Sequence, residues 1–103
     1  MNPYVSVLDI FVRRFAASSV VFNNDTLWIT GGHDGYLELS STEFISLDKP
    51  PIHGPGLPFT ISWHTMVQFG SDLILIIGGK QNGDTKPSNR TWIGKRNCLL
   101  YDF

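Results

Sequence analysis

Cysteine is almost missing from this sequence, which has one, Cys98, among 103 residues. A single cysteine excludes an intrachain disulfide and any zinc site built from several cysteines. Charge is sparse too, because only 17% of the residues are charged and eight Lys and Arg stand against nine Asp and Glu. Positive and negative charges so nearly equal in number do not favour a polyanion or an acidic partner. We therefore expect no nucleic-acid partner.

Long apolar runs are also lacking. The best, Leu73 to Ile77, falls far short of the roughly 18 residues that a membrane span requires. Near the amino terminus, Arg13 and Arg14 follow the apolar segment from Val5 to Val12, whereas a secretory signal has its basic residues first. The sequence thus predicts a soluble protein without a membrane partner. Together with the lone cysteine, it favours an intracellular, cytoplasmic location.

Apolar side chains, glycine and proline are plentiful. Hydrophobic residues make up 42% of the chain, which also has ten Gly and six Pro. This hydrophobic share argues for a chain that folds around a core. Glycine supplies positive φ angles and proline removes a backbone donor, so their number disfavours long helices. We expect an all-β protein of short strands joined by tight turns.

The sequence repeats itself. Placing Gly31-Gly32 on Gly78-Gly79 needs a shift of 47 residues, after which the stretches Ser18 to Gly32 and Thr65 to Gly79 agree at six positions. Ordinary composition would give about one agreement. The four identical pairs besides the glycines are Val20 with Val67, Phe22 with Phe69, Asp25 with Asp72 and Ile29 with Ile76. A period near 50 residues is typical of units that stack, because one unit cannot bury its apolar faces alone.

Each unit is expected to contain a strand, a tight turn, a second strand, a polar loop and further strands. The predicted strands are Ser18 to Phe22, Leu27 to Thr30 and Thr42 to Leu47 in the first unit, and Thr65 to Phe69, Leu73 to Ile77 and Arg90 to Ile93 in the second. The second strand of each unit lacks polar alternation, which predicts cover on both its faces. Proline is tolerated at a sheet edge, so the stretch Pro50 to Pro58 is interpreted as the outermost strand and the link. Leu99 to Phe103 is the candidate for the outer strand of the second unit.

This pattern resembles the kelch repeat, in which an apolar strand, a turn and a second apolar strand end on a double glycine, followed by a variable loop and a third strand. His64 stands where kelch units often carry His, and Arg14 stands where Arg is common. The match departs from the family in the outer strand, because Lys49 to Phe59 offers no Trp or Tyr. The resemblance covers about residues 14 to 93.

The resemblance implies part of a β-propeller, made of two four-stranded antiparallel blades. Residues 14–59 would form the first blade and residues 60–103 the second, while residues 1–13 would supply a strand, the outer strand of a preceding blade. It gives a structural role to His64 and to the double glycines, which are Gly31, Gly32, Gly78 and Gly79. A propeller closes with about four to eight blades, so another copy of the chain is a candidate partner that would complete the ring.

The resemblance also implies non-catalytic protein binding through the loops between strands. The loops His33 to Ser40 and Lys80 to Asn89 are equivalent in the two units and differ in sequence. Loops held on a rigid scaffold commonly carry binding residues, although a merely solvated loop explains any single residue equally well. The candidate partner-binding residues are His33, Asp34, Tyr36, Lys80, Asn82, Lys86 and Arg90. They suit an unidentified protein partner.

Catalytic chemistry finds little support in the sequence. His33, His53, His64 and Cys98 show no metal-ligand spacing, and we expect no metal and no cofactor. The carboxylates Asp34, Glu38 and Glu43 are interpreted as a solvated loop and strand edge rather than an acid and base pair. Two alternatives stay open: an incomplete propeller fragment without a function of its own, and a propeller enzyme of the galactose-oxidase type.

Overall fold

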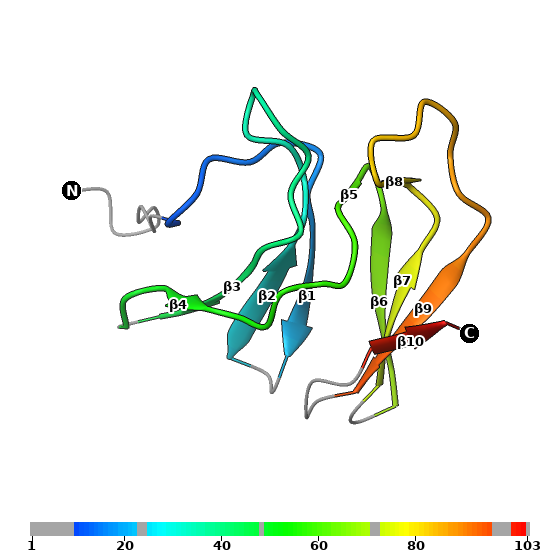
Figure 1. Cartoon of the computed structure of the whole chain (residues 1–103). Helices are drawn as coiled ribbons and strands as arrows, with labels where there is room; N and C mark the ends of the chain where they lie inside the picture. The colour runs from blue at the N-terminus through cyan, green and yellow to red at the C-terminus, as the bar shows by residue number, and fades with distance from the viewer. Residues whose placement is uncertain (1–9, 23–24, 48, 71–72, 96–99, 103) are drawn as a thin grey trace.

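The structure is a computed structural model that describes residues 10–22, 25–47, 49–70, 73–95 and 100–102. Within these residues all regular secondary structure is β-strand (Figure 1). The strands are β1 (Ser18–Phe22), β2 (Thr26–Thr30), β3 (Thr42–Ser46), β4 (Ile52–His53), β5 (Ile61–Ser62), β6 (Thr65–Phe69), β7 (Leu73–Ile77), β8 (Lys80–Gln81), β9 (Thr91–Lys95) and β10 (Leu100–Asp102). The prediction of an all-β fold is confirmed.

Two four-stranded antiparallel sheets contain most of these strands. The first sheet has the order β1-β2-β3-β4, and the second has the order β10-β9-β7-β6. The strand at the proline-rich stretch is the short edge strand β4, as expected for a segment that can form few ladder hydrogen bonds. A third sheet, which the sequence analysis did not predict, pairs β5 with β8. Strand β5 begins the second unit. In the first unit, an isolated bridge between Phe15 and His33 takes the matching place.

The two large sheets pack face to face, with β1 and β6 next to each other where they meet (Figure 1). Cross-strand neighbours point to the same side of a sheet. In the first sheet Val20, Trp28 and Phe44 are such neighbours and form its inner face, turned toward the second sheet. The inner face of the second sheet includes Met66, Ile76 and Trp92, in register in the same way, together with Ile74 of β7.

The link between the units fills the space between the sheets. Leu57 and Phe59 are buried there, and the ring of Phe59 lies 4.5 Å from that of Trp92. Ile61, which is wholly buried, completes this core. The core therefore joins both units, and neither sheet buries its inner face without the other.

The backbone repeats along with the sequence. Positive φ angles occur at Gly31 and Gly78, at Gly32 and Gly79, and at Gly35 and Asn82, in each case at positions 47 residues apart. The same shift relates Ala16 and Trp63, whose φ angles are 56° and 60° although neither is glycine. A positive φ is uncommon for such residues. Its recurrence shows that the repeat determines the chain path leading into each sheet as well as the strands.

Several expectations need correction. Lys80 lies in the short strand β8 rather than in the polar loop, so that loop begins at Asn82. Both faces of the second strands were expected to be covered, yet the faces turned away from the partner sheet are partly open, with Leu27 37% and Ile77 40% exposed. The proposed strand at residues 1–13 lies mostly outside the described residues, and residues 10–13 belong to no strand.

Candidate functional site

Two long loops lie at the same end of the molecule (Figure 1). The first follows β2 and runs from Gly31 to Ser41, and the second follows β8 and runs from Asn82 to Arg90. The first begins at the double glycine that follows β2, and the second is separated from the double glycine that follows β7 by the two residues of β8. The positions predicted to contact a partner therefore lie at this end, on a scaffold of paired strands.

The first loop holds its shape through local hydrogen bonds. The backbone N–H groups of Tyr36 and Leu37 each donate to Oδ1 of Asp34 at 2.8 Å, and that of Gly35 donates to Nδ1 of His33 at 3.0 Å. The bonds from Leu37 and Tyr36 lower the pKa of Asp34 below 3.8. They turn the chain so that Tyr36, at the tip, is 90% exposed. The loop thus presents one large aromatic ring to the solvent.

Glu38 fastens the first loop to the second unit. Its carboxylate accepts hydrogen bonds from Oγ1 of Thr60 and Oγ of Ser62, both at 2.7 Å, and from the backbone N–H of Gly83 at 3.0 Å. Burial acts to raise the pKa of Glu38, but these three hydrogen bonds outweigh it and lower the pKa below 4.5. Because Gly83 belongs to the second loop, one carboxylate holds the bases of both loops in a single arrangement. Sequence reasoning had interpreted Glu38 as part of a solvated loop; it lies in a loop and is half-buried, but these three hydrogen bonds were not foreseen.

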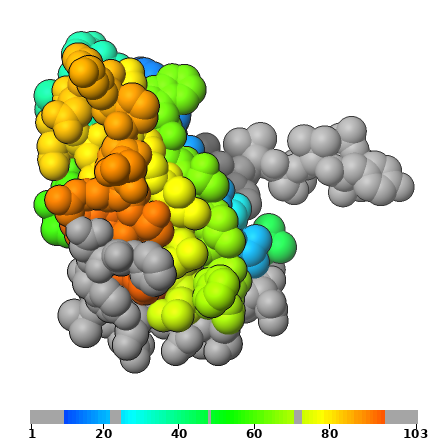
Figure 2. Space-filling view, turned by 90° about the vertical axis from the view of Figure 1, so that its right-hand side faces the viewer, coloured from blue at the N-terminus to red at the C-terminus, as the bar shows by residue number. Residues whose placement is uncertain are grey.

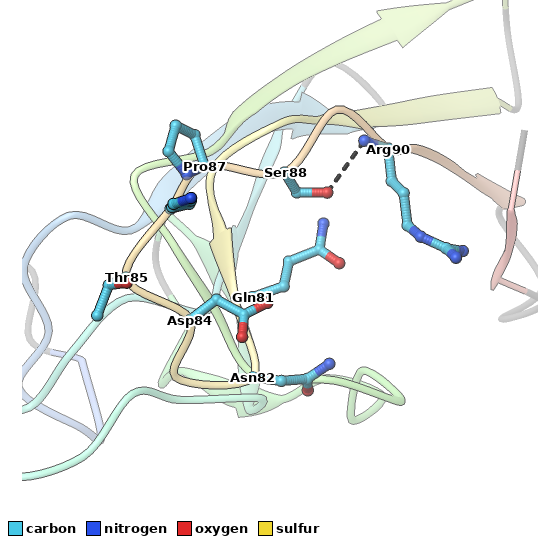
Figure 3. A pocket seen from close by; sticks show the side chains of 8 residues that line it. Gln81, Asn82, Asp84, Thr85, Pro87, Ser88 and Arg90 are labelled. Carbon is cyan, nitrogen blue, oxygen red and sulfur yellow. Dashed lines mark hydrogen bonds between the residues drawn. The ribbon is translucent and has the colours of Figure 1, made fainter.

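The second loop curves around a polar hollow of about 380 Å³ (Figure 3). Its lining residues are Gln81, Asn82, Asp84, Thr85, Lys86, Pro87, Ser88 and Arg90. The guanidinium carbon of Arg90 lies 6.0 Å from the centre of the Trp92 ring, within reach of a cation–π interaction. Of the predicted residues, Asn82, Lys86 and Arg90 thus meet at one hollow, whereas Lys80 does not line it.

Exposed aromatic rings near the first loop were missed by sequence reasoning. Phe15 is 54% exposed, and its ring lies 5.2 Å from that of His33. Trp63 is 67% exposed, and its backbone N–H donates to the carbonyl of Ala16, next to Phe15. The sequence carried no signal for Trp63, because its positive φ, rare for an apolar residue of this size, is a property of the folded backbone.

His64 and the double glycines lie beneath the loops. Nε2 of His64 hydrogen-bonds to Oγ1 of Thr30 at 2.7 Å, which ties the second unit to the second strand of the first. Burial lowers the pKa of His64 to about 4, against the raising effects of Thr30 and of the Glu38 charge, so the ring is neutral at pH 7. A Cβ at Gly31 would collide with the carbonyl oxygen of Ile61, so only glycine lets the units approach this closely.

A buried ion pair lies on the other side of the first sheet. Arg14 and Glu43 form a bond of 2.6 Å with both side chains nearly or fully buried, and the N–H of Phe11 also donates to Glu43. Burial acts to raise the pKa of Glu43, but the bonds from Phe11 and Arg14 prevail and lower it below 4.5. Its interpretation as a solvated strand edge was therefore wrong. Arg14 also donates to the carbonyl oxygens of Gly31 and Ser41, at the two ends of the first loop, so this pair has a structural role at the base of that loop.

The part of the chain that the structure describes holds no candidate metal site. No three of its His, Asp and Glu side chains come together in a way that could hold a metal ion. Cys98 lies outside the described residues. Among those residues, too, no helix is both long and apolar enough to cross a membrane. Comparison with known proteins adds no assignment, since no family model and no curated protein matches this chain.

Proposed function

We propose that the chain is a protein-binding module of the kelch-propeller type, which contacts its partner through the two loops at one end of the sheets. The observation that carries this proposal is the bridge made by Glu38. By bonding to Thr60, Ser62 and Gly83, its carboxylate fixes the loop bearing Tyr36 relative to the loop that encloses the polar hollow. A surface held in place before binding loses less conformational entropy when a partner arrives.

The chemistry of these loops suits a protein partner. Tyr36 offers a nearly fully exposed ring with few rotatable bonds, and such residues are enriched among those that dominate binding energy. Lys86 and Arg90 line the neighbouring hollow and can meet a carboxylate of the partner. An aromatic anchor beside a polar recess with cations fits a folded protein or a peptide carrying an acidic side chain. No cofactor is needed for this role.

Affinity purification from the cells that make the protein tests this function. The bait is the full chain, compared with the double variant Tyr36→Ser/Lys86→Glu and with a matched control, Lys49→Glu, which changes an exposed lysine outside both loops. We expect proteins that bind the wild type and the control at similar levels and are depleted at least tenfold on the loop variant. Circular dichroism verifies that all three chains fold alike. Undiminished binding by the loop variant would refute the proposal.

A further inference from the structure

The contact between the two large sheets joins faces that are not equivalent. Under the 47-residue shift, Val20 on the inner face of the first sheet corresponds to Val67, which points away from the core in the second. Likewise Ile76 on the inner face of the second sheet corresponds to Ile29, on the far side of the first. The two inner faces pack against each other inside the molecule. The repeat counterpart of each inner face is the outer face of the other sheet.

The outer face of the second sheet is apolar and is most open along β6, whereas Leu75 of β7 is half-buried and Ile93 of β9 is buried. It carries Val67, Phe69, Leu73, Leu75 and Ile77, which alternate with the core residues along β6 and β7. Phe69 is 63% exposed and Val67 42% exposed. Figure 2 views the molecule from the side of this sheet, where β6 and β7 reach the surface. Monomeric proteins rarely leave such a continuous apolar area uncovered.

The outer face of the first sheet has the complementary character. Val21 and Leu27 are 51% and 37% exposed, and the charge of Glu43 on this face is already neutralised by Arg14. Val21, Leu27, Ile45 and Leu47, together with Asp25, Thr26 and Ser46, line a hollow of about 220 Å³. This hollow lies where β1 and β2 meet their turn. Phe69 also stands at the turn end of its own sheet, so it is placed to fill such a hollow.

The backbone at the double glycines shows the same unequal use. Gly31 is buried and approaches Ile61 of the second unit so closely that no side chain would fit. Gly78 has a similar φ, 66° against 61°, but it is only half-buried, and a Cβ there would meet nothing nearer than the carbonyl oxygen of Ser88 at 3.6 Å. Both glycines have the backbone conformation that allows another unit to approach closely, but only Gly31 is in contact with one.

The segment leading into the first sheet repeats the link between the units. Leu57 and Phe59 are buried between the sheets, whereas Ile10 and Val12, their counterparts at the same shift, are 37% exposed and half-buried. The N–H of Val12 donates to Glu43, which holds this segment against the first sheet. The outer face of the first sheet therefore already carries the apolar residues, Ile10 and Val12, that could contact a preceding unit.

We propose that the outer face of the second sheet docks on the outer face of the first sheet in another copy of this chain. The two faces differ, so the contact is head to tail, and each copy offers one surface of each kind. A second copy is the occupant because the fit is already realised within one chain, between sheets related by the same repeat. Gly78 of one copy would then approach Arg14 of the next, as Gly31 approaches Ile61.

Two charged variants isolate the two faces. Val67→Asp disables the outer face of the second sheet, and Val21→Asp disables that of the first, while Leu37→Asp changes a 68% exposed residue on the first loop as a control. Masses of the full-length chains are measured in solution by sedimentation velocity, alone and mixed. Should either variant misfold by circular dichroism, Phe69→Gln and Leu47→Gln, at positions 63% and 70% exposed, replace them.

The wild type and the Leu37→Asp control should form multimers, and each face variant alone should be a monomer. Mixing the two face variants should double the mass, giving a dimer of one copy of each, since one intact pair of faces remains. Three results would overturn the proposal. The first is a monomeric wild type, as expected if another protein covers the faces. The second is a mixture that stays monomeric. The third is a face variant that still self-associates, which would mean that one face pairs with itself.

Discussion

His64 is a residue whose environment changes strongly when the chain folds. The residue is 6% exposed, its ring hydrogen-bonds to Thr30, and burial lowers its pKa from 6.5 to about 4. The folded protein therefore binds fewer protons than the unfolded chain between these two values. The stability that this difference provides is fully present above about pH 6.5 and is lost as the pH falls toward 4.

Acidification should thus begin to weaken the fold at a pH above 4.5, through His64. We predict that the free energy of unfolding falls by about 3 kcal/mol between pH 6.5 and 4, since each unit of pKa shift is worth about 1.4 kcal/mol. The pKa values of Glu38 and Glu43 are lowered below 4.5, so the stability that they provide begins to be lost near pH 4.5 and adds to the decline below it. Urea unfolding across this range measures the decline.

The matched control for this prediction is another histidine. The free energy of unfolding of the His64→Gln variant should be nearly independent of pH between 6.5 and 4.5, because the glutamine amide cannot take up a proton there. His53→Gln, which changes an exposed ring stacked on Phe11, should keep the wild-type decline. A wild-type stability that stays constant over this interval would show that His64 is not buried as described.

At the scale of elements, the double glycines allow the cost of backbone strain to be distinguished from the cost of a steric collision. Gly31 and Gly78 have φ angles of 61° and 66°, so alanine suffers the same left-handed strain at both positions. Only at Gly31 would the new Cβ also collide with Ile61. We predict that Gly31→Ala destabilises the fold by about 1–3 kcal/mol more than Gly78→Ala, the usual range for overpacking.

Urea unfolding tests this difference, with both changes introduced into the Val67→Asp chain so that association does not contribute. Equal losses of stability from the two substitutions would contradict it, because they would show that the first unit does not approach the second at Gly31. A larger loss from Gly78→Ala would point to the same conclusion.

The sequence predicted the five-residue strands well. β1, β6 and β7 have the predicted bounds, because apolar, partly β-branched runs there end at turn residues or at glycine pairs. Strands of two residues carry no periodicity, so β5 and β8 were missed and Lys80 was assigned to a loop. The contacts of Glu38 and Glu43 connect residues 22 to 45 positions apart, and no local pattern marks a carboxylate that distant groups will bind.

At the scale of the whole molecule, two packed sheets leave an unmatched face on each side. The repeat explains this arrangement, since every unit offers one face to the unit before it and another to the unit after it. The loops that we propose as the binding surface depend on the same stacking, because Glu38 of the first unit bonds to Thr60, Ser62 and Gly83 of the second. The association and the recognition that we propose would thus both depend on neighbouring units rather than on one sheet.

Native mass spectrometry of the unmodified chain at micromolar concentration tests this account most directly. Propellers close with about four to eight blades, and each chain carries two four-stranded sheets. We predict one dominant species of about two to four copies, the numbers that would close a ring. A single species of one copy, with the fold intact by circular dichroism, would contradict the claim that these units require neighbours.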